Sequence, residues 1–99
     1  MTSAELEARD QLDRDILAYV REMQQLAPVT AESVLEFEQR QRRRRVTLRD
    51  IRDRLGYLTD AGYLKVARTW QAGAWIDDWL ITADGADVLD GAKPPRSEL

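Results

Sequence analysis

The spacing of apolar residues changes at Gly62, and this change restricts the chain to a mainly helical fold with one β-hairpin. Before Gly62, apolar residues recur three and four positions apart, which places them on one face of a helix. After it, residues 63–70 and 75–81 are rich in β-branched and aromatic side chains. Residues 71–74 include a glycine and can form the turn between these two segments, which predict an antiparallel hairpin.

Two helices are expected in the first part of the chain. Residues 3–27 predict one long helix, which Thr2 or Ser3 can cap and which Pro28 ends. A second helix is expected to begin at Thr30. No helix breaker follows it, so the arginines further along the chain form either its last turn or an exposed loop.

A third helix is expected to begin at Thr47, which together with Asp50 resembles a capping box. It ends at Gly62, where the hairpin pattern starts. A short fourth helix opens within residues 82–85 and closes at Gly91. The sequence therefore predicts a mainly α fold with a three-helix core, a small β-hairpin and a C-terminal helix.

A chain of 99 residues suffices for one domain, which we expect to span residues 1–92, with 93–99 as a disordered tail. The sequence contains no cysteine and no histidine, which excludes disulfides and thiolate metal sites and removes the commonest general base and zinc ligand. We therefore expect no enzyme activity, no metal and no cofactor. No apolar run approaches the roughly 20 residues of a membrane span, and the polar N-terminus is not a secretory signal. A cytoplasmic protein without a membrane partner is expected.

The net charge of −3 conceals a basic middle between two acidic ends. Residues 1–39 contain three arginines and nine acidic residues. Residues 40–68 contain ten Lys and Arg against three Asp, and residues 69–99 contain two basic residues against six acidic ones. Such an uneven distribution indicates a localised surface that binds anions.

Two motifs flank the hairpin in a characteristic order. Residues 55–64 (LGYLTDAGYL) resemble the end of the recognition helix in MarR-, PadR- and ArsR-like regulators, and residues 79–89 (WLITADGADVL) are similar to their passage from the second wing strand into the last helix. The motifs cover about a third of the chain, and the order of elements covers nearly all of it. The resemblance implies a winged helix-turn-helix fold, with the hairpin as the wing, in a DNA-binding transcription regulator. Such a small protein suits a bacterium or a phage. The stretch between the second and third helices is longer and more basic than the compact turn usual in these families.

Double-stranded DNA is the expected partner, because guanidinium groups bind phosphates in a bidentate manner and release counterions. Arg49 is the best candidate for a base contact, whereas the carboxylates of Asp50 and Asp53 oppose groove binding. A solvated loop, or a loop that binds an acidic protein surface, is the alternative reading of the arginine run. The expected DNA-binding residues are Arg40, Arg42, Arg43, Arg44, Arg45, Thr47, Arg49, Arg52 and Arg68.

The apolar stripe of the first helix is wider than one small domain needs, so a homodimer is expected. Trp79 and Ile81 share a strand face and are expected to point inward, whereas Trp75, nearer the tip, is a candidate for partner contact. The alternative function is a winged-helix module for protein interaction or assembly. The expected dimer or partner contacts are Leu12, Ile16, Tyr19, Met23 and Trp75.

Overall fold

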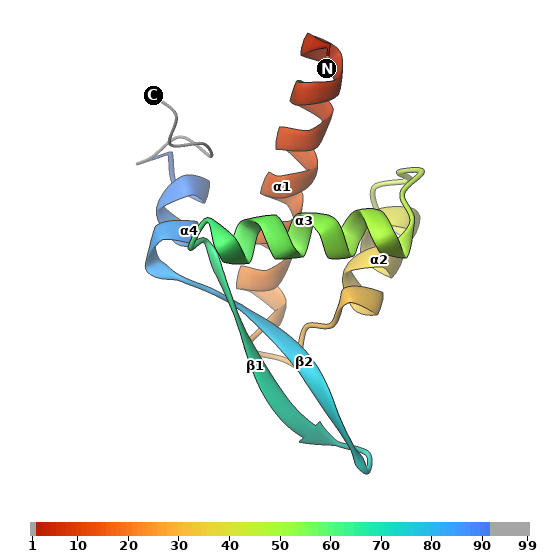
Figure 1. Cartoon of the computed structure of the whole chain (residues 1–99), viewed down its shortest axis with the longest axis vertical. Coiled ribbons are helices and arrows are strands. Elements are labelled where there is room, and N and C mark those ends of the chain that lie inside the picture. The colour runs from red at the N-terminus through yellow and green to blue at the C-terminus, as the bar shows by residue number, and fades with distance from the viewer. Residues whose placement is uncertain (1, 92–99) are drawn as a thin grey trace.

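The computed structural model describes residues 2–91, in which helices and strands follow in the predicted order (Figure 1). This part of the chain is mainly helical, with four helices and one antiparallel two-stranded hairpin. No helix within it is both long enough and apolar enough for a bilayer span. The tail predicted at 93–99 lies outside the described residues. The elements are α1 (Ser3–Met23), α2 (Ala31–Arg40), α3 (Leu48–Asp60), β1 (Leu64–Gln71), β2 (Ala74–Ile81) and α4 (Ala83–Leu89).

Each of the four described helices begins after a threonine. The hydroxyls of Thr2, Thr30, Thr47 and Thr82 accept a hydrogen bond from the backbone N–H three residues further on. This bond satisfies one of the backbone donors that a helix N-terminus leaves unpaired. The first three helices add a reciprocal side-chain bond and form complete capping boxes. The starts predicted for the helices are therefore confirmed.

The first helix is shorter than predicted, because it ends at Met23 rather than at residue 27. The carbonyl of Met23 accepts hydrogen bonds from the N–H groups of Leu26 and Ala27, which form a turn before Pro28. The side-chain oxygen of Gln24, the residue after α1, accepts a hydrogen bond from the Ile81 N–H at 2.9 Å. The helix therefore ends in a local turn of the backbone before it reaches Pro28.

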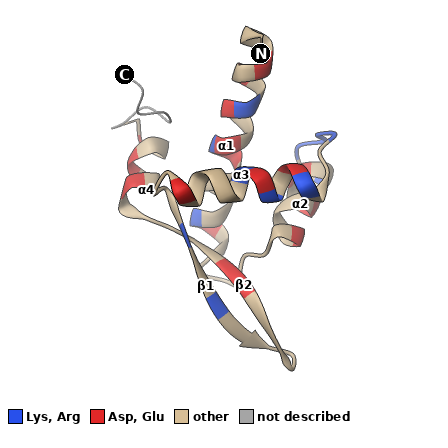
Figure 2. Ribbon diagram, viewed as in Figure 1, with Lys and Arg blue, Asp and Glu red and all other residues tan. Residues whose placement is uncertain are grey.

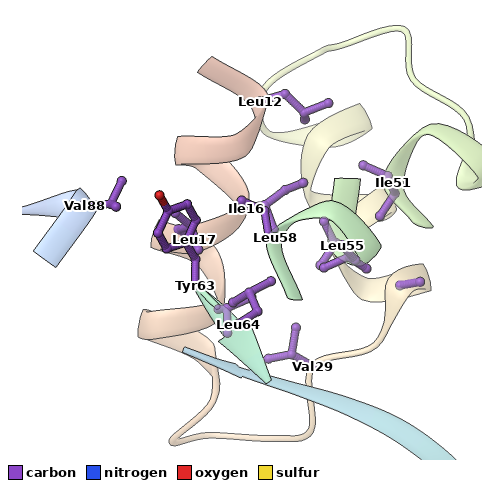
Figure 3. Close-up of a cluster of buried hydrophobic side chains, with 13 residues drawn as sticks. Leu12, Ile16, Leu17, Val29, Ile51, Leu55, Leu58, Tyr63, Leu64 and Val88 are labelled. Atoms are coloured by element: carbon purple, nitrogen blue, oxygen red, sulfur yellow. The ribbon is translucent and has the colours of Figure 1, made fainter. Parts of the chain in front are cut away.

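The core gathers the apolar faces of all six elements (Figure 3). Val88 of α4 lies on one side of α1 and Ile51 of α3 on the other. The core-facing residues of α3 repeat at helical spacing, and all three are fully buried: Ile51, Leu55 and Leu58. Burial of each such side chain contributes about 1.5–3 kcal/mol. The core thus fixes α3 against α1 and leaves the opposite face of α3 at the surface.

The hairpin joins the core at one end and projects from it at the other (Figure 1). Leu64 at its base is buried, and Trp79 and Ile81 pack against the core, as predicted. The strands meet in a two-residue turn at Ala72 and Gly73, whose φ angles of 52° and 80° match a type I′ turn. The turn predicted at residues 71–74 is therefore confirmed, with Gln71 and Ala74 forming the last pair of the two strands.

Gly85 in the first turn of α4 allows a close approach between α4 and the hairpin. A Cβ at this position would lie 2.8 Å from Cγ1 of Ile81 and would clash with the backbone oxygen of Tyr63. Gly56 in the middle of α3 is the opposite case, because no neighbouring atom lies within 4 Å of its Cβ position.

We expect Gly85→Ala to lower the free energy of unfolding by about 1–3 kcal/mol, because the added methyl forces backbone apart in a packed region. Gly56→Ala is the matched control. It should raise the free energy of unfolding by up to about 1 kcal/mol, because alanine is the better helix former. Urea denaturation of both variants measures whether each substitution lowers or raises the free energy of unfolding. A Gly85→Ala protein as stable as the wild type would contradict the packing described.

Candidate functional site

The arginines are concentrated on the segment that joins α2 to α3 and on the first turns of α3 (Figure 2). Two features hold this segment in place. The backbone N–H of Arg44 donates to the carbonyl of Glu38 at 2.9 Å, and the side-chain amide of Gln39 donates to the carbonyl of Val46 at 3.1 Å. Arg43 between them adopts a left-handed backbone conformation with φ of 54°. The segment therefore follows a defined path, although it has no regular secondary structure.

Arg44 is the inward-facing member of the run. Its Nη2 donates to Oδ2 of Asp15 at 2.6 Å, and its Nε forms an ion pair with Oε1 of Glu38 at 2.7 Å. The Nε–Glu38 contact is not aligned as a hydrogen bond. Only 27% of the Arg44 side chain is exposed, and both carboxylates are buried. This arginine was predicted to bind phosphate, but the structure turns it toward the two buried carboxylates, where it anchors the segment to α1 and α2.

A second arginine joins α3 to α1. The guanidinium of Arg54 donates to both carboxylate oxygens of Asp13, at 2.8 and 2.7 Å, and it lies over the ring of Tyr57. Bidentate pairs of this kind are the strongest charged hydrogen bonds that side chains form. Because Asp13 is 2% exposed, the pair belongs to the interior and positions the middle of α3 relative to α1.

The buried acids Asp13, Asp15 and Glu38 were not singled out in the sequence. The burial of Glu38 could have been predicted, because Glu38 continues the helical spacing of Ala31 and Val34, which are both buried. Burial raises the pKa of the Glu38 carboxyl above its ordinary value of 4.5, and the Asp15 carboxylate raises it further. The guanidiniums of Arg44 and Arg42 act in the opposite direction without cancelling the increase.

The remaining arginines near this segment lie at the surface. Arg40 pairs with Glu36 at 3.8 Å and Arg52 pairs with Glu32 at 3.3 Å, and all four side chains are largely exposed. Arg42 is half-exposed, 3.6 Å from Asp15. Exposed pairs of this kind contribute little to stability and exchange easily for another anion.

Three exposed arginines on the connecting segment and the first turn of α3 have no ion-pair partner among residues 2–91. They are Arg43, Arg45 and Arg49, which we call the arginine surface. Thr47 lies between them, and its hydroxyl accepts the Asp50 N–H at 3.1 Å while the Asp50 carboxylate accepts the Thr47 N–H at 2.9 Å. The side chain expected to bind DNA at this position is thus already used as a helix cap.

The hairpin tip presents a pair of exposed tryptophans. Trp70 and Trp75 face each other across the strands, with ring centroids 5.4 Å apart, and they are 59% and 58% exposed. Arg68 lies over the Trp75 ring, 6.0 Å from its centroid. Asp78 points away from the surface, because its carboxylate accepts the Val29 N–H at 2.7 Å.

The dimer prediction for α1 requires a correction. Leu12 and Ile16 are buried within this single chain, and Tyr19 and Met23 are partly buried against the same core. The helix needs a wide apolar stripe because α3, α4 and β2 all pack against it. Of the five predicted partner contacts, only Trp75 is well exposed.

Comparison with known proteins assigns no family. No protein-family model matches this sequence, and no curated protein sequence matches it either. Residues 2–91 also contain no group of three His, Cys, Asp or Glu side chains placed to hold a metal ion. The arginine surface and the hairpin tip are therefore the features from which a function can be inferred.

The buried acids predict a pH dependence that one variant isolates. Because the folded protein raises the pKa of Glu38, it binds the proton more tightly than the unfolded chain does. As the pH rises above 4.5 and through the folded pKa, the wild type should lose stability relative to Glu38→Gln. Urea denaturation of both proteins across this range measures the difference.

Glu36→Gln is the matched control, because it makes the same chemical change on the exposed face of α2. A wild type that gains stability over Glu38→Gln as the pH rises would show that pairing with Arg44 outweighs burial.

Proposed function

We propose that this chain is a DNA-binding protein of the winged helix-turn-helix type that acts as a transcription regulator. The order of three helices, a hairpin and a fourth helix supports the proposal, because it matches the order in the regulators that the sequence resembles. In this proposal α3 lies in the major groove and the hairpin is the wing. The observation that carries the proposal is the arrangement of the arginine surface around the start of α3.

The arginine surface suits the phosphate backbone of a duplex. Arg44 turns inward, and its neighbours Arg43 and Arg45 are exposed, so the anchored segment presents two guanidiniums at defined positions. Arg49 adds a third on the first turn of α3. Arginines held in place lose less conformational entropy on binding than arginines of a flexible loop. Exposed Arg40 and Arg52 extend the same charge once their surface pairs exchange for phosphate. Half-exposed Arg42 adds to this charge from its position 3.6 Å from the buried Asp15.

Affinity is proposed to come mainly from phosphates rather than from bases. The exposed face of α3 carries Asp53 and Asp60, whose carboxylates repel the backbone of DNA. Asp50 is less of an obstacle, because its carboxylate is held in the helix cap. Arg49 is the one residue on this face that we propose as a base contact. Its guanidinium group best matches guanine, whose O6 and N7 can both accept a hydrogen bond from it.

A second candidate function is that of a protein-interaction module. The exposed pair Trp70 and Trp75 favours it, because exposed tryptophans are typical of contact surfaces between proteins. A homodimer, if formed, would use such exposed residues rather than the buried stripe of α1. Arg68 at the tip could serve either function, since it lies beside Trp75 and carries a free charge.

Duplex binding measured across salt concentrations separates the two functions. Affinity should fall steeply between about 50 and 200 mM salt, and Arg45→Ala should reduce the slope of log affinity against log salt by about one. The combined change of Arg43 and Arg45 to alanine should reduce it by about two. Arg21→Ala is the control, because Arg21 pairs with Asp90 away from this surface. Absence of duplex affinity at low salt would contradict the DNA-binding proposal and favour the second function.

A further inference from the structure

A cleft of about 510 Å³ lies between α1, the arginine-bearing segment and the first turns of α3. Part of its wall is apolar and comes from Ala8, Leu12 and Val46. Its size falls within the range of pockets that hold small molecules. Neither of the proposed functions assigns a ligand to this cleft.

Four arginines reach the cleft, and they differ in how far their charge is compensated. Arg44 and Arg54 also bind the buried acids of α1 and α2. Arg9 and Arg45 have no ion-pair partner among residues 2–91. The Nε of Arg9 is moreover buried and donates no hydrogen bond within this part of the chain. A buried donor without an acceptor is costly, and an anion in the cleft would remove that cost.

Two carboxylates also line the cleft and limit what it can bind. Asp50 is held by the backbone N–H of Thr47. Asp53 is exposed and faces the same space. Its negative charge opposes an anionic ligand and competes with it for the guanidiniums of Arg9 and Arg45. A ligand therefore needs an apolar group as well as a charge to bind measurably.

We propose that this cleft binds a small organic anion, in which a phosphate or carboxylate is attached to a compact apolar group. Arg9 and Arg45 bind the oxyanion from opposite walls, because a guanidinium matches the geometry of either group. Leu12 and Val46 pack against the apolar part. Arg45 also belongs to the arginine surface, so an occupied cleft withdraws one phosphate contact from DNA. This last consequence rests on the proposed function, whereas binding of the ligand does not.

Phenyl phosphate is a suitable probe, because it joins an oxyanion to a compact apolar ring. Titration of the ¹⁵N-labelled protein should shift the Nε–H signal of Arg9 and the amide signal of Val46 in a saturable manner. Inorganic phosphate, which lacks the ring, should bind more weakly, and benzyl alcohol, which lacks the charge, should cause no such shift. If phenyl phosphate leaves both signals unchanged at millimolar concentrations, the proposal is wrong.

Variants distinguish this cleft from general attraction to arginines. Arg9→Ala and Arg45→Ala should each weaken phenyl phosphate about tenfold, the loss of a charged hydrogen bond. Asp53→Asn should strengthen it about threefold, because a repelling charge is removed. Arg43→Ala, outside the cleft, should bind as the wild type does. If Arg43→Ala weakens binding as much as Arg9→Ala, the ligand is bound by surface charge and the cleft is not its site.

Duplex affinity with and without phenyl phosphate tests the link to DNA separately. In the wild type the probe should weaken duplex binding, and in Arg9→Ala this effect should be lost at the same probe concentration. A protein that binds the probe but no duplex would contradict the proposed function and leave the ligand site standing. A protein that binds duplex without any response to the probe would contradict the link.

Discussion

Two arginines that bind buried carboxylates determine how the rest of this surface is arranged. Arg54 holds Asp13 of α1 from the side of α3, and Arg44 holds Asp15 from the connecting segment. Ions removed from water are costly, so such pairs add little net stability, whereas loss of one partner is strongly destabilising. Their effect here is positional. They join α1, α3 and the segment between α2 and α3 in one arrangement, on which the exposed arginines depend.

The same pairs divide a run of similar residues into two groups. Five of the six residues from Arg40 to Arg45 are arginines, and any of them could bind an anion. The structure turns Arg44 inward and leaves Arg43 and Arg45 outside, with a left-handed backbone at Arg43. Arg44 therefore stabilises the position of the segment, whereas its neighbours Arg43 and Arg45 stay exposed and can bind an anion. Arg45 is shared between the arginine surface and the cleft beside α1, which would couple a small anion to DNA.

The periodic and capping patterns of the sequence predicted most of the fold, because helix starts and the hairpin depend on local chemistry. The threonine caps and the inward position of Trp79 are examples. The predicted end of α1 was wrong, and so was the assignment of Leu12 and Ile16 to a dimer contact. These two side chains are instead buried by elements that are distant in sequence. The buried acids were missed for the same reason: a carboxylate such as Asp13 can be buried only where a distant arginine meets it. The sequence therefore predicted which region carries the candidate site, but not the role of each arginine within it.

The central claim is that Arg44 positions the arginine surface without binding DNA itself. The double variant Glu38→Gln with Arg44→Gln tests it most directly, because it removes both charges of one buried pair and leaves the net charge unchanged. Cooperative thermal unfolding confirms that the variant is folded. The slope of log duplex affinity against log salt should then equal that of the wild type, even if the affinity of the variant is lower. A slope reduced by about one would place Arg44 on a phosphate and contradict the claim.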